Sequence, residues 1–302
     1  MKTGGSNYIT INGSMDSPVI GTYHLYPEVV TGDLAAMFEH GQRKITLVLW
    51  YAPVSFAPDH VWHHVCDSSG GALFEQHQAN LVAILQAIRN VGYNEMHLRF
   101  AAQGKALVRE WHGWQQAQFD ENSNFVLSTI NLVDTNKGDL PVIYDLALEQ
   151  AWEVWNTNPT QRAYCMNLWR AYVNAGLDPA MSCGFSVIHG GTGLQPFLLR
   201  LQQGRLPFPG CYCVDAYGFE YQVLTGIMPV LTSFGEQSKP VYLQETYYND
   251  AISCADVRRA IADTPALNFQ GIFQWPEVRD TPPGGGVPDV YPRRFDNYLV
   301  EI

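Results

Sequence analysis

Two acidic residues of this 302-residue chain stand where they could together break a glycosidic bond. Glu245 follows the apolar run VYLQ, where a carboxylate must be hydrogen-bonded, paired or neutralised because an isolated buried charge is costly. Glu149 ends a second β-type run, PVIYDLALE, and strand alternation places Asp145, Ala147 and Glu149 on one face. One carboxylate could attack the anomeric carbon, while the other protonates the departing oxygen and then activates water.

Each carboxylate also has a structural interpretation. Glu245 could belong to an ion pair inside the fold. Glu149 could be an ordinary loop residue, since it opens the segment EQAWEVW. If Glu149 is not the proton donor, Asp145 or Asp215 is the next candidate for that role.

Further polar and aromatic side chains stand near the ends of other β-type runs. Aromatic residues make up 13% of the chain, and sugar rings stack on the flat apolar faces of Trp and Tyr. A neutral, polyhydroxylated ligand therefore fits this composition better than a charged one. Candidate substrate-binding or positioning residues are Arg99, Trp50, His189, Asp215, Tyr217, Tyr247 and Trp275, with Trp111 as a further stacking candidate.

Eight β-type runs alternate with helical patterns from one end of the chain to the other. In the helix expected over 76–91, Leu81, Ile84, Leu85 and Ile88 recur at helical spacing, and Gly92 ends it. Strict alternation predicts a parallel sheet, and eight units are the number that closes a (β/α)8 barrel. The expected strands are 19–24, 45–51, 96–102, 141–149, 182–189, 211–217, 240–248 and 270–276.

We therefore expect a single α/β domain, a (β/α)8 TIM barrel over 18–302 with long loops at its C-terminal face, after an N-terminal extension over 1–17. An open doubly wound sheet is the alternative, although no glycine-rich dinucleotide fingerprint follows any strand. Active sites of barrels lie at the carboxyl ends of the strands, where the residues named above are expected.

Composition disfavours several classes of partner. The net charge of −11 would repel nucleic acid and anionic membranes. The chain has no run of about 18 consecutive apolar residues, so the sequence predicts no membrane span. The N-terminus shows no apolar signal-peptide core. A mature domain whose signal has been removed would look the same, so we lean towards a secreted or periplasmic location. The oligomeric state is left open.

Other hydrolytic chemistries find less support. His60, His63 and His64 lie in a loop without an obvious carboxylate frame, whereas a zinc site needs three or four converging ligands. Ser186 lacks the second glycine of a nucleophile elbow. We therefore expect no metal or organic cofactor, and a metal-dependent barrel hydrolase is the third interpretation.

The C-terminal third resembles a known family. The stretch from Tyr212 to Pro276, with VDAYGF, KPVYLQETYYN and GIFQWPE, is similar to the clan A (4/7 superfamily) retaining glycoside hydrolases, which are TIM barrels. Pro240, Val241 and Glu245 match the context of the clan's nucleophile. The resemblance implies a glycosidase in which Glu245 is that nucleophile.

The same resemblance implies roles for other residues. Trp275 matches the tryptophan that floors the sugar subsite, Tyr217 could contact the nucleophile, and Arg99, within NVGYNEMHLRF, resembles the arginine that steadies it. The clan places its acid/base Glu at the end of the fourth strand, usually after an Asn, whereas this chain has Leu148 before Glu149.

We therefore predict a glycoside hydrolase that cleaves a poly- or oligosaccharide with retention of configuration. Glu149 and Glu245 should then have carboxyl groups about 5–5.5 Å apart, whereas roughly 6.5–9.5 Å would favour inversion. Leu148 motivates a second hypothesis, a catalytically degenerate barrel that binds carbohydrate or serves a structural role. The identity of the sugar, its linkage and endo or exo cleavage are not determined by the sequence.

Overall fold

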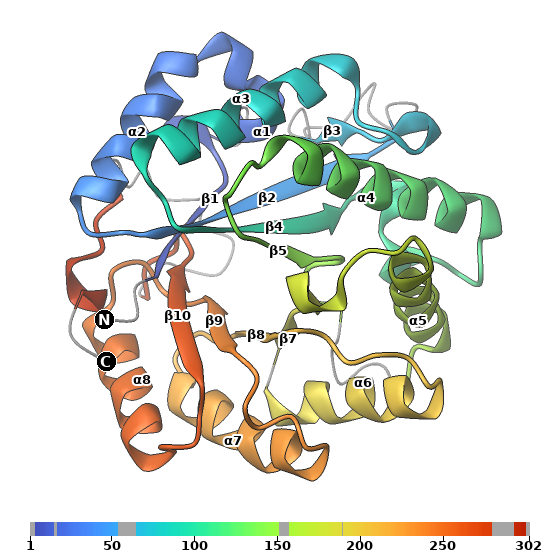
Figure 1. The fold of residues 1–302 in the computed structure, drawn as a ribbon, viewed down its shortest axis with the longest axis vertical. Helices are drawn as coiled ribbons and strands as arrows, with labels where there is room; N and C mark the ends of the chain where they lie inside the picture. The colour runs from blue at the N-terminus through green and yellow to red at the C-terminus, as the bar shows by residue number, and fades with distance from the viewer. Residues whose placement is uncertain are drawn as a thin grey trace.

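The computed structural model describes residues 4–14, 17–53, 65–150, 157–188, 190–279 and 293–299. Its sheet is parallel throughout, in the order β6-β5-β4-β2-β1-β10-β9-β8-β7, and it curls with the helices around its outside (Figure 1). The strands are β1 Gly5–Tyr8, β2 Lys44–Ala52, β3 Cys66–Asp67, β4 Glu95–Ala102, β5 Val142–Asp145, β6 Ser182–Gly184, β7 Val187–Ile188, β8 Tyr212–Asp215, β9 Val241–Glu245 and β10 Phe269–Gln274.

The two ends of this order, β6 and β7, are halves of one barrel strand. Gly184 ends β6 with a φ of +69°, and only Phe185 and Ser186 separate it from β7. β6 pairs with β5 and β7 pairs with β8, so this divided strand connects both edges of the sheet. β3 lies off the main path of the sheet and pairs only with the end of β2. The remaining described strands, with β6 and β7 taken as one, make the eight strands of a (β/α)8 TIM barrel. The expected fold class is confirmed, and the open-sheet alternative is excluded.

The helices follow the sequence patterns closely. In α3, Leu81, Ile84, Leu85 and Ile88 are fully buried, and Gly92 caps the helix with a φ of +100° while its N–H donates to the Ile88 and Arg89 carbonyls. The helices are α1 Val19–Thr22, α2 Pro27–Glu39, α3 Glu75–Val91, α4 Gln116–Asn136, α5 Pro159–Asn174, α6 Gly191–Gln203, α7 Glu220–Ser233 and α8 Ala251–Asp263.

The first barrel strand is not where the sequence pattern placed it. Residues 19–24 form α1 and part of a 3₁₀ helix, Tyr23–Leu25, and Val19 and Ile20 are buried in the core outside the sheet. The strand is β1, which pairs in parallel with β2 and β10. The expected N-terminal extension over 1–17 is therefore wrong, because these residues include β1, a strand of the barrel.

The short polar strand β1 can form part of the barrel because its polar side chains are hydrogen-bonded. Asn7 on β1 donates from Nδ2 to the Gln244 carbonyl at 2.9 Å and to the Gln274 carbonyl at 3.3 Å. At Gly5 a Cβ would lie 1.8 Å from the Lys44 carbonyl oxygen, so the close approach of the two backbones requires glycine. Four residues without an apolar alternation give no strand signal, which is why the pattern missed them.

A bulge in β9 sets the direction of its last side chain. Val214 pairs with Leu243 and Asp215 pairs with Glu245, so Gln244 is an extra residue in β9. Alternation would turn Glu245 the same way as Leu243, which packs in the core outside the barrel wall. The extra residue lets both Gln244 and Glu245 contact side chains of the barrel interior, since bulges re-aim side chains next to sites.

All six cysteines are buried and free. Among the described residues, no helix has the length and apolar character needed to cross a membrane.

Candidate active site

Arg99 is the centre of the site, and it faces three carboxylates inside the barrel. Its side chain is fully buried on β4. Nε lies 3.1 Å from Oδ2 of Asp145, Nη2 lies 2.9 Å from Oδ2 of Asp215, and Nη1 lies 2.5 Å from Oε1 of Glu245. Burial opposes the charge of the guanidinium, but these three carboxylates outweigh it and raise the pKa of Arg99. One permanent positive charge is thus shared by residues of four strands.

Glu245 is held at both oxygens. Oε1 accepts from Arg99, and Oε2 accepts from the hydroxyl of Tyr217 at 2.7 Å. Burial, and then the charge of Glu245, raise the pKa of Tyr217, so this hydroxyl keeps its proton and stays a donor. These two donors hold the carboxylate in a fixed orientation, which suits a nucleophile.

Glu149 sits in the opposite environment. Its backbone has a φ of +56°, and its N–H donates to the hydroxyl of Ser186 at 2.7 Å. Burial, and then the charge of Glu245, raise the pKa of Glu149 to about 8, against the opposing effect of Arg99. Glu149 therefore holds a proton near neutral pH, which is the condition of a general acid.

The placement of Glu149 corrects one step of the sequence argument. β5 ends at Asp145, so strand alternation does not extend to Glu149. A turn after the strand carries it instead, with a hydrogen bond from the Leu148 N–H to the Phe100 carbonyl at 2.9 Å and one from the Gln150 N–H to the Ala147 carbonyl at 3.2 Å. Glu149 faces Glu245, but a loop rather than the strand carries it.

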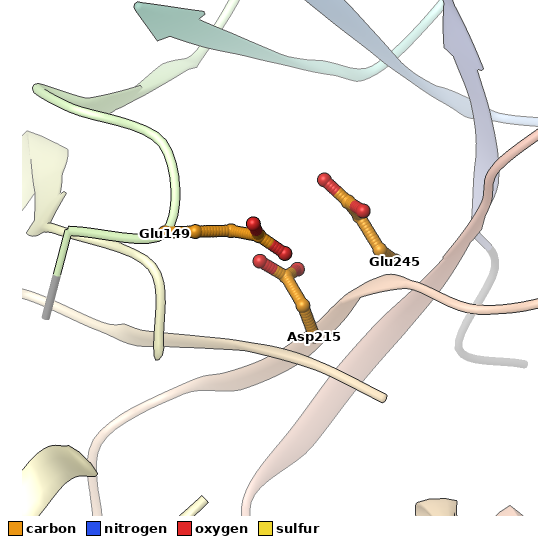
Figure 2. Close-up of side chains that lie close together, drawn as sticks. All are labelled: Glu149, Asp215 and Glu245. Carbon is orange, nitrogen blue, oxygen red and sulfur yellow. The ribbon is translucent and has the colours of Figure 1, made fainter. Parts of the chain in front are cut away.

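The carboxyl groups of Glu149, Asp215 and Glu245 converge (Figure 2). One oxygen from each lies within 4.8 Å of the other two. Oxygen ligands of this kind suit hard cations such as Mg²⁺ or Ca²⁺. However, Arg99 already donates to one oxygen each of Asp215 and Glu245, so this cluster is partly neutralised by the protein itself.

The described histidines do not support the metal-dependent interpretation. His24 lies in the 3₁₀ helix, where its Nδ1 is 3.1 Å from Nδ2 of Asn80, and His97 contacts Glu95 and Gln244. Among the residues that the structure describes, the three carboxylates are the one close cluster of histidine, cysteine or acidic side chains, and it contains no histidine. His60, His63 and His64 lie outside the described residues.

A cavity of about 750 Å³ opens over the two glutamates. Its lining includes five of the residues named from the sequence: Glu149, Glu245, Tyr217, Trp50 and Trp275. Trp50 and Trp275 pack with the small apolar cluster of Ile9, Val48 and Ala101, which supports them in the lining of the cavity. The cavity thus combines two aromatic faces with two carboxyl groups.

Other candidates lie behind this lining or away from it. Arg99 and Asp215 do not border the cavity and are buried beneath it. Tyr247 stacks edge-on against Tyr217, with ring centroids 5.2 Å apart. Trp111 is buried, and its indole donates to the Lys105 carbonyl at 2.8 Å, so the expectation that it stacks on a sugar is wrong. His189 lies outside the described residues.

Two residues that position the site carried no signal of that role in the sequence. Ser186 was weighed only as a nucleophile, yet its hydroxyl accepts from Nη2 of Arg99 at 3.1 Å and from the Glu149 N–H, while its N–H donates to Oδ1 of Asp145 at 3.1 Å. Asn7, with Oδ1 3.5 Å from Nη1 of Arg99, was hidden in the supposed extension. Arg109 and Glu277 also border the cavity. Of these two, Glu277 had a signal in the sequence, because it stands two residues after Trp275 in the motif GIFQWPE.

The fold has clear relatives among solved structures. No protein-family profile and no curated protein sequence matches the chain. GH5_18 from Streptomyces cattleya, in complex with Manβ1-4GlcNAc, is 11% identical with a TM-score of 0.63, over 98% of this chain and 79% of that chain. A GH5_18 from Bifidobacterium longum subsp. longum, with the same ligand, is 12% identical with a TM-score of 0.63, over 98% and 77%.

A β-1,4-mannanase from the sea hare Aplysia kurodai is 11% identical with a TM-score of 0.55, over 99% of this chain and 92% of that chain. At these identities the likeness is one of fold. The chain shares the (β/α)8 barrel fold of these glycoside hydrolases. The resemblance noted in the C-terminal third thus extends, as architecture, over nearly the whole chain.

Proposed function

We propose that this protein is a glycoside hydrolase that acts on an oligo- or polysaccharide with retention of configuration. The observation that carries the proposal is the pairing of two glutamates in opposite environments at one cavity. Glu245 accepts two hydrogen bonds as a carboxylate, and Glu149 has its pKa raised to about 8. One is therefore ready to attack while the other is ready to give a proton.

In the first step, an oxygen of Glu245 forms a bond to the anomeric carbon while the bond from that carbon to the leaving oxygen breaks. Glu149 donates its proton to the leaving oxygen. In the second step, water attacks the anomeric carbon, gives a proton to Glu149 and releases Glu245. The approach of the two carboxyl groups, with oxygens within 4.8 Å, supports retention, because inversion needs about 6.5–9.5 Å to admit water between them.

The charges of the site also support the change of role that Glu149 must undergo. Glu245 is the charge that does most to raise the pKa of Glu149, after burial. When Glu245 becomes an ester it loses that charge, so the pKa of Glu149 falls. The deprotonated Glu149 can then accept a proton from water in the second step.

The cavity supports a carbohydrate substrate. Trp50 and Trp275 offer apolar faces for sugar rings, and about 750 Å³ is ample for a disaccharide segment. Since two of the fold relatives were crystallised with Manβ1-4GlcNAc and another is a β-1,4-mannanase, β-mannosides are the first substrates to assay.

The decisive experiment is to trap the covalent intermediate. A 2-deoxy-2-fluoro glycoside with a good leaving group should label Glu245, as located by mass spectrometry of peptides. Glu245→Gln should not be labelled, and NMR of the fresh product should show the configuration of the substrate. A product of inverted configuration would contradict the double displacement.

Leu148 supports a second candidate, a barrel that binds carbohydrate without cleaving it. Leu148 packs with the apolar cluster beside Trp50 and Trp275, where the clan implies an amide. Absence of turnover by the parent protein on a broad glycan panel, together with measurable glycan binding, would favour this candidate over the enzyme.

A further inference from the structure

Asp215, at the end of β8, has one carboxyl oxygen that finds no donor. Its side chain is 1% exposed. Oδ2 accepts from Nη2 of Arg99 at 2.9 Å, but Oδ1 is buried and has no hydrogen-bond partner among the described residues. Buried polar atoms are normally satisfied, so an orphaned oxygen beside an active site needs an explanation.

The other two carboxylates around Arg99 show that this is particular to Asp215. Asp145 uses Oδ2 for Arg99 and Oδ1 for the Ser186 N–H. Glu245 uses Oε1 for Arg99 and Oε2 for Tyr217. Both oxygens of each side chain therefore accept a hydrogen bond, whereas Asp215 has one oxygen without a donor, at which a proton could reside.

The groups that face Asp215 make a proton there reasonable. Asp145 on β5, Glu245 on β9 and Glu149 on the loop after β5 all raise its pKa, after burial, while Arg99 on β4 lowers it. Tyr217 lies nearby as a neutral hydroxyl, and Arg109 acts on Glu149 from the cavity rim. Figure 2 shows the carboxyl groups of Glu149 and Asp215 pointing toward one another. Four carboxyl groups cannot all be ionised around one buried guanidinium.

We propose that Asp215 and Glu149 form a carboxyl pair that shares one proton, so that Asp215 is a positioning residue that keeps the acid/base protonated. This inference rests on the proposed function. Before the first step the pair holds one proton, which goes to the leaving oxygen. In the second step the pair regains one proton from water. When the pair loses its proton, Glu245 loses its charge to the ester bond, so the number of negative charges facing Arg99 stays the same.

The test is the pH profile of Asp215→Asn. The amide oxygen can still accept from Arg99, but the side chain cannot carry a negative charge. Without that charge Glu149 loses its proton more easily, so the basic limb of kcat should move to lower pH by roughly one unit or more. Ser186→Ala is the matched control, because it removes contacts to Arg99 and Glu149 without changing any charge. It should lower kcat while leaving the basic limb in place.

A basic limb that stays in place in Asp215→Asn, with activity lowered equally at every pH, would overturn the shared proton and leave only a structural role. A limb that moves equally in Ser186→Ala would overturn it as well.

A second measurement needs no turnover and no variant that might misfold. The ¹³C carboxyl resonances of Glu149 and Asp215 in the parent protein, followed by NMR across pH, should each report the same two midpoints, because a shared proton couples their titration. Two independent single midpoints would overturn the proposal. If this coupling is found but no glycoside is cleaved, the proposed function fails while the carboxyl pair stands.

Discussion

The barrel interior holds two buried polar clusters, and β4 supplies the centre of both. At the amino end of the strand, His97 contacts Glu95 at 3.1 Å and Gln244 at 3.0 Å, and Lys44 lies 2.8 Å from the same Glu95. Two residues further along β4, Arg99 meets the carboxylates of the candidate active site. We refer to these as the lower and the upper cluster.

The two clusters shift the pKa of a half-buried glutamate in opposite directions. In the lower cluster burial would raise the pKa of Glu95, but hydrogen bonds and charges from His97 and Lys44 outweigh it and lower the pKa to about 2. In the upper cluster burial and the charge of Glu245 raise the pKa of Glu149 to about 8. The difference lies in the balance of donors and carboxylates: the lower cluster satisfies its acid, and the upper cluster crowds several acids around one cation.

This contrast separates a stabilising cluster from a reactive one. A glutamate paired with a lysine is inert, whereas a glutamate forced to keep its proton beside a cavity can donate it. Substitutions in the two clusters should therefore differ in their effects on activity and on stability.

Glu245→Gln in the upper cluster should reduce kcat/KM on the order of 10⁴- to 10⁶-fold, because the nucleophile is lost. Glu95→Gln in the lower cluster is the matched comparison, and it should change kcat/KM little while lowering stability. Steady-state kinetics and urea unfolding of both variants measure the two effects. Comparable losses of activity in both would erase the distinction between the clusters.

Glu149→Gln should reduce kcat about 10²- to 10⁴-fold on substrates with poor leaving groups, since these need the proton most. The loss of kcat should be smaller on aryl glycosides that release an acidic phenol. The parent kcat should fall as pH rises through about 8, the pKa of Glu149, and this basic limb should vanish in the variant. A basic limb that persists in Glu149→Gln would assign the proton to another group.

Arg99→Met should destabilise the protein by about 3–5 kcal/mol, because three buried carboxylates lose their shared cation. Lowering the pH should recover part of the lost free energy of unfolding, since the carboxylates can then be protonated. Urea unfolding at neutral and mildly acidic pH measures the difference. Equal destabilisation at both pH values would indicate lost packing alone.

The two glutamates should also give opposite slopes of stability against pH. Glu95 has a folded pKa of about 2, below its ordinary 4.5, so its contribution is present above that value and is lost as pH falls towards 2. Glu149 has a folded pKa of about 8, so its contribution is present below 4.5 and is lost as pH rises through 8.

Glu95→Gln should therefore flatten the acid side of the stability profile, and Glu149→Gln the alkaline side, each by on the order of 2–3 kcal/mol. Urea unfolding between acidic and alkaline pH checks both slopes. Flattening of the same side of the profile in both variants would contradict the opposite pKa shifts.

Trp275→Ala should have the smallest effect, raising KM roughly tenfold through loss of a stacking face. Trp111→Ala provides the contrast, since Trp111 packs against Tyr164 with ring centroids 5.6 Å apart and does not border the cavity. It should lower stability and leave KM unchanged, which thermal unfolding and kinetics can separate.

How far the sequence predicted the molecule differs between elements. The helix Glu75–Val91 follows directly from apolar periodicity and a terminal glycine, because these act within a few residues of one another. β1 was missed because Gly5–Tyr8 becomes a strand only through pairing with β2 and β10, the latter more than 260 residues away. Glu149 was predicted as a strand residue, but a turn carries it.

The chain by itself determined the alternation of strands and helices, the carboxylates at the strand ends and the tryptophans beside them, since these depend on residue type and local order. The tertiary structure alone decided that a bulge turns Glu245 inward, that Arg99 serves three acids, and that Asp215 keeps one oxygen free. Arg99 meets its carboxylates across 46, 116 and 146 residues of sequence. Electrostatic interactions act through distance in space, so the division of charge and protons among these groups exists only once the barrel has closed.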